Sequence, residues 1–248
     1  MAVIGIMDSG VGGLSVFREI RKVLPDERYI YFSDNAHCPY GDKSTEYIQD
    51  RCREIVSGMI AQGARAVVIA CNTATAAAIA MLRSEFDIPF IGMEPAVKPA
   101  ALGTRTGVIG VLATAGTLKA SKYLDTRDRF TEGITVVEHV GRGFVELVET
   151  GELSGAHAEE VVRASLEPLL QAGADTIVLG CTHYPFLLPV LQKVAGPGIR
   201  FIDPAPAVAR RLCDVLAENN IGSADGEPDI KLVSSGPADT LQRTFLLI

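Results

Sequence analysis

Short runs of apolar, often β-branched residues recur along the chain and alternate with stretches in which apolar residues return every three or four positions. The runs predict buried strands: VIGIM from Val3, YIYF from Tyr29, AVVIA from Ala66, FIGM from Phe90, GVIGVL from Gly107, ITVV from Ile134, TIVLG from Thr176 and FID from Phe201. Helical spacing is clearest over residues 45–63, with Thr45 as the expected N-cap and Gly63 as the stop, and over residues 158–172. Strands that alternate with helices predict the α/β class, with mainly parallel sheets covered by helices.

Three segments of the first half recur in the same order in the second half. VIGIMDSGVGG resembles VIGVLATAGTL from Val108, AVVIACNTA resembles TIVLGCTHY, and IPFIGMEPAV from Ile88 resembles IRFIDPAPAV from Ile199. Because order and spacing are both kept, we interpret the pattern as a diverged internal duplication. It predicts two similar α/β lobes related by a pseudo-twofold axis, with a boundary near residues 94–102.

Composition narrows the class of partner. The 248 residues are 48% hydrophobic, which is enough for a sizeable core, and the formal net charge is −7. Without a cluster of lysine or arginine, no nucleic-acid partner is expected, whereas an acidic small molecule can still bind at helix N-termini. The N-terminus has no signal-peptide pattern and no apolar run approaches a membrane span, so we expect a soluble, cytoplasmic protein with no membrane partner.

The cysteines are odd in number and widely spaced, which in a reducing compartment favours free thiols over disulfides. A closed metal site is not expected, because no local pair of ligands is present. Cys52 and Cys213 follow helical apolar patterns and are predicted to lie in the core, and Cys38 is predicted to be a bystander near a cleft.

Cys71 and Cys181 stand apart because they occupy equivalent places in the duplication, each just after a predicted strand. Ligands of open α/β sheets bind beyond the carboxyl ends of the strands. Polar residues follow each thiol: Asn72 and Thr73 in the first half, Thr182 and His183 in the second. At the start of a helix such residues can hold a substrate carboxylate.

Two lobes placed face to face would deliver one thiol to each side of a shared cleft. A racemase needs this arrangement, because it removes a proton from one face of a carbon and supplies one to the other. A thiol with an ordinary pKa of about 8.5 can serve as either base or acid after modest tuning. Asp8, after the first strand, and His183, near Cys181, could exchange protons with the two thiols. The glycine-rich turn DSGVGG lacks the spacing of a dinucleotide site or a P-loop and leaves only an anion cradle open.

With these residues assembled, the chain closely resembles the glutamate racemases of the aspartate/glutamate racemase superfamily over almost its full length. The segments that carry the resemblance are GIMDSGVGGLSV, SDNAHCPYGDKS, ACNTATA, IGMEPA, ATAGTLKASKY, VELVETGEL and LGCTHYP. The resemblance implies interconversion of L- and D-glutamate with no pyridoxal phosphate, metal or other cofactor, and supply of D-glutamate to bacterial peptidoglycan. One departure is HVGRGFVELVE, where many relatives carry a Cys-Pro pair ahead of the phenylalanine.

The resemblance also implies residue roles. Cys71 would be the base for D-glutamate and Cys181 the base for L-glutamate. Asp8 and His183 match auxiliary acid/base positions, and Glu149 matches a further acidic position. Substrate contacts would come from Asp8, Ser9, Tyr40, Gly41, Asn72, Thr73, Thr182 and His183, joined by Thr114 and Thr117.

The family fold implies a first lobe of residues 1–97 plus 207–248 and a second lobe of residues 98–206; a homodimer is a further expectation. Other functions stay open from the residues alone. The same scaffold could racemise aspartate or another small acidic substrate. The two lobes could instead form a non-catalytic module that binds a carboxylate, with both cysteines merely packed. A thiol redox protein or cysteine hydrolase would leave one of the duplicated cysteines without a role.

Overall fold

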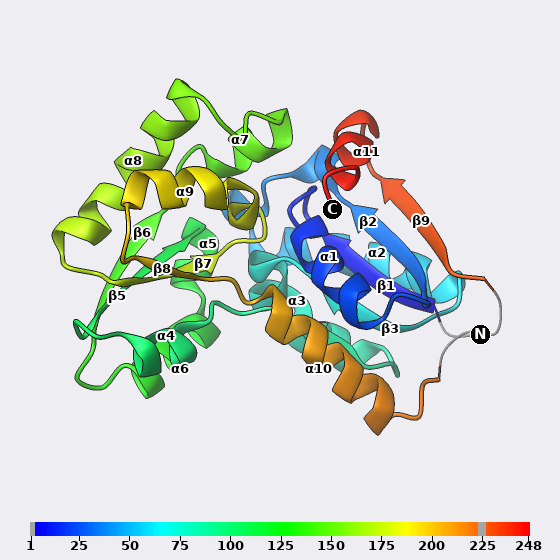
Figure 1. The fold of residues 1–248 in the computed structure, drawn as a ribbon. Helices are drawn as coiled ribbons and strands as arrows, with labels where there is room; N and C mark the ends of the chain where they lie inside the picture. The colour runs from blue at the N-terminus through cyan, green and yellow to red at the C-terminus, as the bar shows by residue number, and fades with distance from the viewer. Residues whose placement is uncertain (1–2, 223–226) are drawn as a thin grey trace.

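The computed structural model describes residues 3–222 and 227–248. Over these ranges the chain forms one five-stranded and one four-stranded sheet, and the neighbouring strands in both sheets are parallel (Figure 1). The strands are β1 (Val3–Asp8), β2 (Arg28–Ser33), β3 (Ala64–Ile69), β4 (Phe90–Gly92), β5 (Val108–Ala113), β6 (Thr135–Val140), β7 (Thr176–Gly180), β8 (Arg200–Ile202) and β9 (Asp229–Ser234). The strands expected from the apolar runs are therefore confirmed, and so is the α/β class.

The strand order supports the internal duplication. The first sheet runs β4-β3-β1-β2-β9 and the second runs β8-β7-β5-β6, so β1 to β4 and β5 to β8 follow the same order. Asp8 closes β1 and Ala113 closes β5, at equivalent positions. The two lobes thus share one topology, to which the first lobe adds β9.

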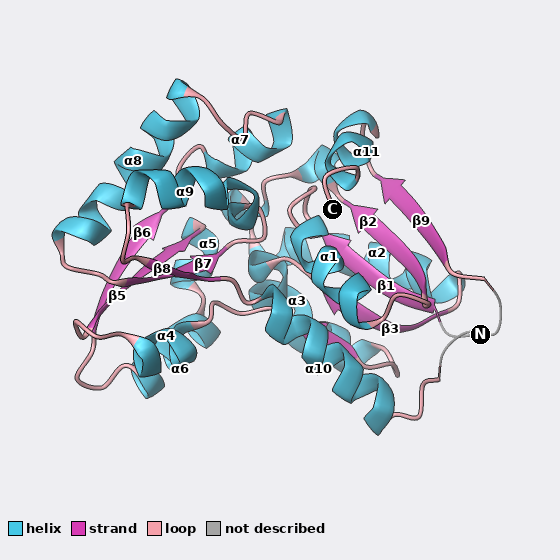
Figure 2. Cartoon of the chain, in the orientation of Figure 1, coloured by secondary structure: helices cyan, strands magenta, loops and turns pink. Residues whose placement is uncertain are grey.

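Helices cover both faces of each sheet (Figure 2). They are α1 (Leu14–Val23), α2 (Thr45–Ala61), α3 (Asn72–Glu85), α4 (Val97–Gly103), α5 (Ala115–Lys119), α6 (Ser121–Phe130), α7 (Phe144–Thr150), α8 (Ala156–Gln171), α9 (Leu188–Ala195), α10 (Ala205–Glu218) and α11 (Asp239–Phe245). In the second lobe, α8 and α9 lie on one face of the sheet, and α4 and α6 lie on the other. Both predicted helices are present, as α2 and α8.

The N-cap of α2 differs from the expectation. The hydroxyl of Ser44, not Thr45, accepts the backbone N–H of Tyr47 at 3.2 Å. Ser44 has the extended backbone conformation of an N-cap, whereas Thr45 is already the first helical residue, so the expectation was wrong by one position. Gly63 follows the helix with a φ of 94°, a left-handed conformation that suits a glycine stop.

Strand β9 has no counterpart among the predicted strands. Its sequence, DIKLVS, alternates charged and apolar residues instead of forming an apolar run, because it lies at the edge of the first sheet. It pairs in parallel with β2, which lies near the other end of the chain. The C-terminal segment therefore contributes to the first sheet. The lobe boundaries at residues 97 and 207 stay a prediction.

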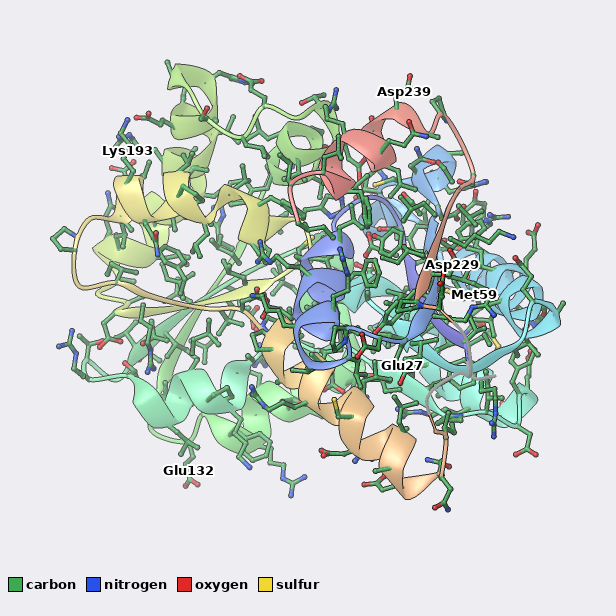
Figure 3. All side chains as sticks on the ribbon, turned by 45° about the vertical axis from the view of Figure 1, so that its right-hand side comes forward. Glu27, Met59, Glu132, Lys193, Asp229 and Asp239 are labelled. Atoms are coloured by element: carbon green, nitrogen blue, oxygen red, sulfur yellow. The ribbon has the colours of Figure 1, made fainter. Side chains whose placement is uncertain are left out.

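The apolar core is continuous between the lobes. One cluster of buried side chains includes Val11 and Leu14 of the first lobe and Phe144 and Tyr184 of the second. Charged side chains such as the labelled Glu132, Lys193 and Asp239 are exposed at the periphery (Figure 3). Within the described ranges, no helix combines the length and apolar character needed to cross a membrane.

Candidate active site

The two duplicated thiols occupy equivalent places at the carboxyl ends of inner strands. Cys181 directly follows β7, and Cys71 follows β3 after one intervening residue. Cys71 is also the N-cap of α3, where its Sγ accepts the backbone N–H of Ala74 at 3.4 Å. Both side chains are buried, at 6% and 7% exposure. Each lobe therefore presents one thiol at the edge of its sheet where ligands bind.

The thiols share one small cavity between the lobes, which we call the inner cavity. Its lining residues are Ser9, Pro39, Tyr40, Gly41, Cys71, Asn72, Thr73, Thr114, Val145, Gly180, Cys181, Thr182 and His183. Its volume is about 20 Å³, which is room for about one water molecule and not for an amino acid. Loops or lobes must therefore separate before a substrate can reach both thiols.

An outer pocket of about 340 Å³ adjoins the inner cavity, and the two share the lining residues Pro39, Gly41, Thr114 and Val145. A volume of this order accommodates a small organic ligand. Arg142 also lines the outer pocket, from the segment that departs from the family pattern. The outer pocket thus offers a route from solvent to the thiols.

Most of the predicted site residues line the inner cavity, and three lie directly behind its wall. Asp8 accepts the hydroxyl of Thr182 at 3.1 Å, and Thr117 lies 3.0 Å from the hydroxyl of Thr114. Glu149 lies behind His183. The residues expected from the sequence therefore converge on one place.

On the Cys71 side, the thiol donates to the hydroxyl of Ser9 at 3.6 Å. Burial, followed by the negative charge of Asp8, raises the pKa of Cys71 to about 12. Asp8 is fully buried, and burial raises the pKa of its carboxyl to about 6, although the charge of His183 and the N–H of Gly10, at 2.9 Å, act in the opposite direction. Near neutral pH, Asp8 is thus a carboxylate close to a thiol that retains its proton.

On the Cys181 side, three ionisable side chains form a row. The Nδ1 atom of His183 lies 3.8 Å from Cys181 Sγ, and its Nε2 atom lies 2.7 Å from Glu149 Oε1. Burial alone would lower the pKa of His183, but hydrogen bonds with Cys181, Cys38 and Glu149 outweigh it and raise the pKa well above its ordinary value. Burial opposes ionisation of Glu149 too, yet the His183 hydrogen bond and charge hold the Glu149 pKa below its ordinary value. The row places a carboxylate and an imidazolium beside the sulfur of Cys181, an arrangement in which the imidazolium can donate a proton to a thiolate.

Hydroxyl groups join the lobes on another side of the cavity. Thr73, at the start of α3, lies 2.9 Å from the hydroxyl of Thr114 and 3.3 Å from that of Thr117. Thr114 is the N-cap of α5. Helix α3 of the first lobe and helix α5 of the second lobe thus meet through their first turns.

Asn72 is the clearest ligand-binding group on the wall. Its Oδ1 and Nδ2 atoms are buried and have no hydrogen-bond partner among the residues that the structure describes. Buried amides are nearly always paired, so this carboxamide is available to a bound molecule.

Sequence reasoning missed the support of Tyr40. Its hydroxyl donates to Asp34 at 2.6 Å, and Arg51 of α2 donates to both carboxylate oxygens of Asp34. The hydroxyl of Tyr40 is therefore used to hold its own loop against α2. Asp34 stands in the segment SDNAHCPYGDKS, but no pattern in the sequence pairs it with Arg51, and only the folded chain brings the two together.

The other cysteines fall in different environments. Cys52 is fully buried in α2, as predicted, but Cys213 is only half-buried on α10, so its expected core position was wrong. The half-buried Cys38 lies 3.8 Å from Glu149 Oε1. Among the described residues, Cys38, Glu149 and His183 form a cluster whose ligand atoms lie within 4.8 Å of one another. Such a group could hold a metal ion although the sequence has no local ligand pair.

Comparison with known proteins places this geometry among racemases. Residues 4–212 match the family model described as Asp/Glu/Hydantoin racemase. A protein named glutamate racemase from Stutzerimonas stutzeri is 48% identical over 248 residues, which are 100% of this chain and 94% of that protein. The crystal structure of Escherichia coli glutamate racemase with L-glutamate and the activator UDP-MurNAc-ala is similar, with a TM-score of 0.87, 36% identity, and coverage of 98% of this chain and 95% of that one. The structure of glutamate racemase from Francisella tularensis with D-glutamate has a TM-score of 0.85 and 29% identity, covering 99% and 92% of the two chains.

Proposed function

Because the chain belongs to the Asp/Glu/Hydantoin racemase family, we propose that it interconverts L- and D-glutamate by moving a proton between Cys71 and Cys181 at the α-carbon. The observation that carries this proposal is that equivalent thiols from the two lobes line one cavity. The product D-glutamate would supply peptidoglycan synthesis. Cytoplasmic location and a homodimer stay predictions.

In the proposed reaction, the thiolate of one cysteine takes the α-proton and the thiol of the other cysteine protonates the opposite face. Cys71 acts on D-glutamate and Cys181 on L-glutamate, so each cycle in one direction exchanges the protonation states of the two sulfurs. No cofactor is needed, because the proton lost by the substrate remains on one sulfur while the proton gained comes from the other.

Neighbouring groups set the protonation of each sulfur. The Asp8 carboxylate, near a thiol whose pKa is raised to about 12, can draw off the Cys71 proton once substrate is bound. A thiolate of high pKa is populated rarely but is a strong base, which the weakly acidic α-proton requires. On the other side, Glu149 holds His183 in its protonated form, and the imidazolium can return a proton to the Cys181 thiolate. These are the roles that we propose for the three auxiliary residues.

Substrate carboxylates would bind to donors at the two strand ends. The amide of Asn72 is unpaired among the described residues, and the first turn of α3 presents backbone N–H groups beside it. The remaining proposed contacts are Asp8, Ser9, Tyr40, Gly41, Thr73, Thr114, Thr117, Thr182 and His183. Most of them are buried polar groups whose dipoles can replace the water lost by an acidic substrate.

The test is exchange of the α-proton in deuterated water, followed by NMR, together with optical rotation. We expect L- and D-glutamate to gain α-deuterium and to interconvert, and L-aspartate to react far more slowly. Cys71→Ser and Cys181→Ser should each abolish racemisation, and the same NMR assay measures whether either variant still exchanges the α-proton of one enantiomer. Cys213→Ser, a thiol on α10, is the matched control and should remain active.

Two results would contradict the proposal. Wild-type turnover of both enantiomers by Cys181→Ser would remove the two-base scheme. Binding of glutamate with no α-deuterium in either enantiomer would instead indicate a carboxylate-binding module, and faster reaction of aspartate would change the substrate.

A further inference from the structure

Cys38 has no part in the proposed reaction, yet it lies against the pair formed by His183 and Glu149. Its Sγ is 3.8 Å from Glu149 Oε1, the same oxygen that lies 2.7 Å from His183 Nε2. One ligand atom from each of the three residues lies within 4.8 Å of the others. The residues come from the loop before the 3₁₀ turn at Tyr40–Asp42, from α7 and from the segment after β7, so the cluster spans both lobes.

The three donors match what a zinc ion takes in proteins. Zinc binds thiolate sulfur, imidazole nitrogen and carboxylate oxygen, and sites with three protein ligands keep a fourth position open. Here the three atoms already face one another, joined by the protons of Cys38 and His183. An ion between them would replace those two protons.

The groups around the cluster orient its ligands. A Cβ at Gly10 would lie 2.1 Å from Glu149 Oε1 and 3.1 Å from Cys38 Sγ, so the bare glycine leaves the carboxylate and thiol facing each other. The backbone N–H of Val11 donates to Glu149 Oε1 at 2.9 Å. The other ring nitrogen of His183 faces Cys181. Outer hydrogen bonds of this kind fix the direction of metal ligands.

We propose that Cys38, Glu149 and His183 form a binding site for a zinc-type divalent cation, and that occupation of this site stops racemisation. On binding, the Cys38 thiol becomes a thiolate and the His183 imidazolium becomes a neutral imidazole that coordinates through Nε2. Glu149 is already a carboxylate. Metal binding therefore releases protons from the ligands.

The inhibitory consequence rests on the proposed function, whereas the binding site does not. With Nε2 held by the ion, His183 loses its hydrogen bond to Glu149 and its positive charge beside Cys181. Cys181 then lacks the group that exchanges protons with it. The effect should be reversible on adding a chelator, because no covalent bond is formed.

Binding is tested directly with cobalt(II), which takes zinc sites and reports on its ligands. The metal-free protein should gain a thiolate-to-cobalt absorption band and the visible bands of a four-coordinate ion. Cys38→Ser should lose the thiolate band, and zinc affinity should fall by more than the roughly 100-fold that loss of an outer partner can cost. Cys213→Ser is the matched control, since it removes another half-buried thiol, and should keep the band. In weakly buffered solution, zinc should release about one proton fewer from Cys38→Ser than from the wild type, because the Cys38 thiol is then missing.

A second measurement needs no variant. Mass spectrometry after brief alkylation should show that zinc protects Cys38 but leaves Cys213 as reactive as before. A thiolate band that persists in Cys38→Ser, protection of Cys181 without Cys38, or no cobalt band in the wild type would overturn the site. A chain that binds cobalt through Cys38 but exchanges no α-proton would keep the site and refute the proposed function. A chain that racemises glutamate equally well with zinc bound at Cys38 would refute the inhibition.

Discussion

The Asp8→Asn variant is expected to become more stable relative to the wild type as pH rises, and to lose racemase activity. The Asp8 carboxyl is fully buried at the end of β1, and burial raises its pKa from 3.8 to about 6. A carboxyl with a raised pKa contributes stability that is fully present below its unfolded pKa and is lost as pH rises through its folded pKa. The contribution of Asp8 is therefore lost between about pH 4 and pH 6.

The size of the effect follows from the same two values. A rise from 3.8 to about 6 corresponds to ~3 kcal/mol of folding free energy, which the wild type loses once Asp8 is ionised. The asparagine variant carries no such charge. Its amide also changes the hydrogen bonds with Gly10 and Thr182, but that cost does not depend on pH. The difference between the two proteins across the pH range therefore isolates the charge.

The assay is urea unfolding of both proteins at several pH values from 4 to 8. The free energy of unfolding of Asp8→Asn minus that of the wild type should increase by ~2.5 kcal/mol over this range, with most of the change below about pH 6.5. Exchange of the α-proton should be lost at every pH, because the amide cannot accept the Cys71 proton. A stability difference that stays constant with pH would refute the reasoning, since Asp8 would then bear no cost of burial.

Three other changes test separate parts of the structure. Glu149→Gln should lower kcat/KM about 100-fold, and equally in both directions because the equilibrium constant of a racemisation is one. The alkaline limb of its pH profile should move to lower pH, because His183 loses the carboxylate that raises its pKa. An unmoved limb would contradict this role of Glu149. Gly12→Ala places a Cβ 2.3 Å from His183 Nδ1, so activity should fall sharply and the free energy of unfolding should drop by about 1–3 kcal/mol. The control is Gly58→Ala, whose Cβ meets no neighbouring atom within 4 Å in the described residues and should leave activity intact. Equal activities of the two variants would refute the close approach of Gly12 to His183. Asp175→Asn should destabilise the protein at neutral pH, because hydrogen bonds lower the Asp175 pKa to about 2, and should destabilise it progressively less as pH falls from about 4 toward 2. This pH dependence is opposite to that of Asp8. Thermal unfolding at several pH values measures it, and a variant as stable as the wild type at neutral pH would refute it.

The sequence was sufficient for the parts of the fold that depend on buried runs. Continuous apolar runs identified the strands around Cys71 and Cys181, because strands covered by helices on both faces have no polar side. The internal repeat then placed the two thiols at equivalent strand ends. Edge strand β9 was missed, because half of its side chains face away from the core and its partner β2 lies at the other end of the chain.

Contacts between loops could not be read from the sequence in the same way. Cys38 belongs to no repeat, and its position near Glu149 depends on how the two lobes pack. The link from Tyr40 through Asp34 to Arg51 joins a loop to a helix without any periodic signal. For Cys213, the helical pattern was right but the exposure was wrong, since the pattern does not show how far the covering layer extends.

The turn after β1 shows how the repeat was broken to build an asymmetric site. In DSGVGG, bare glycines let the backbone of the first lobe approach side chains of the second, with Gly12 directly against His183. The equivalent turn after β5 carries Thr114 instead, which meets Thr73 through its hydroxyl. One contact between the lobes therefore brings an imidazolium and carboxylates together, and the other brings together only neutral hydroxyls. The shared strand order delivers two equivalent thiols, and these unequal turns give each sulfur different partners.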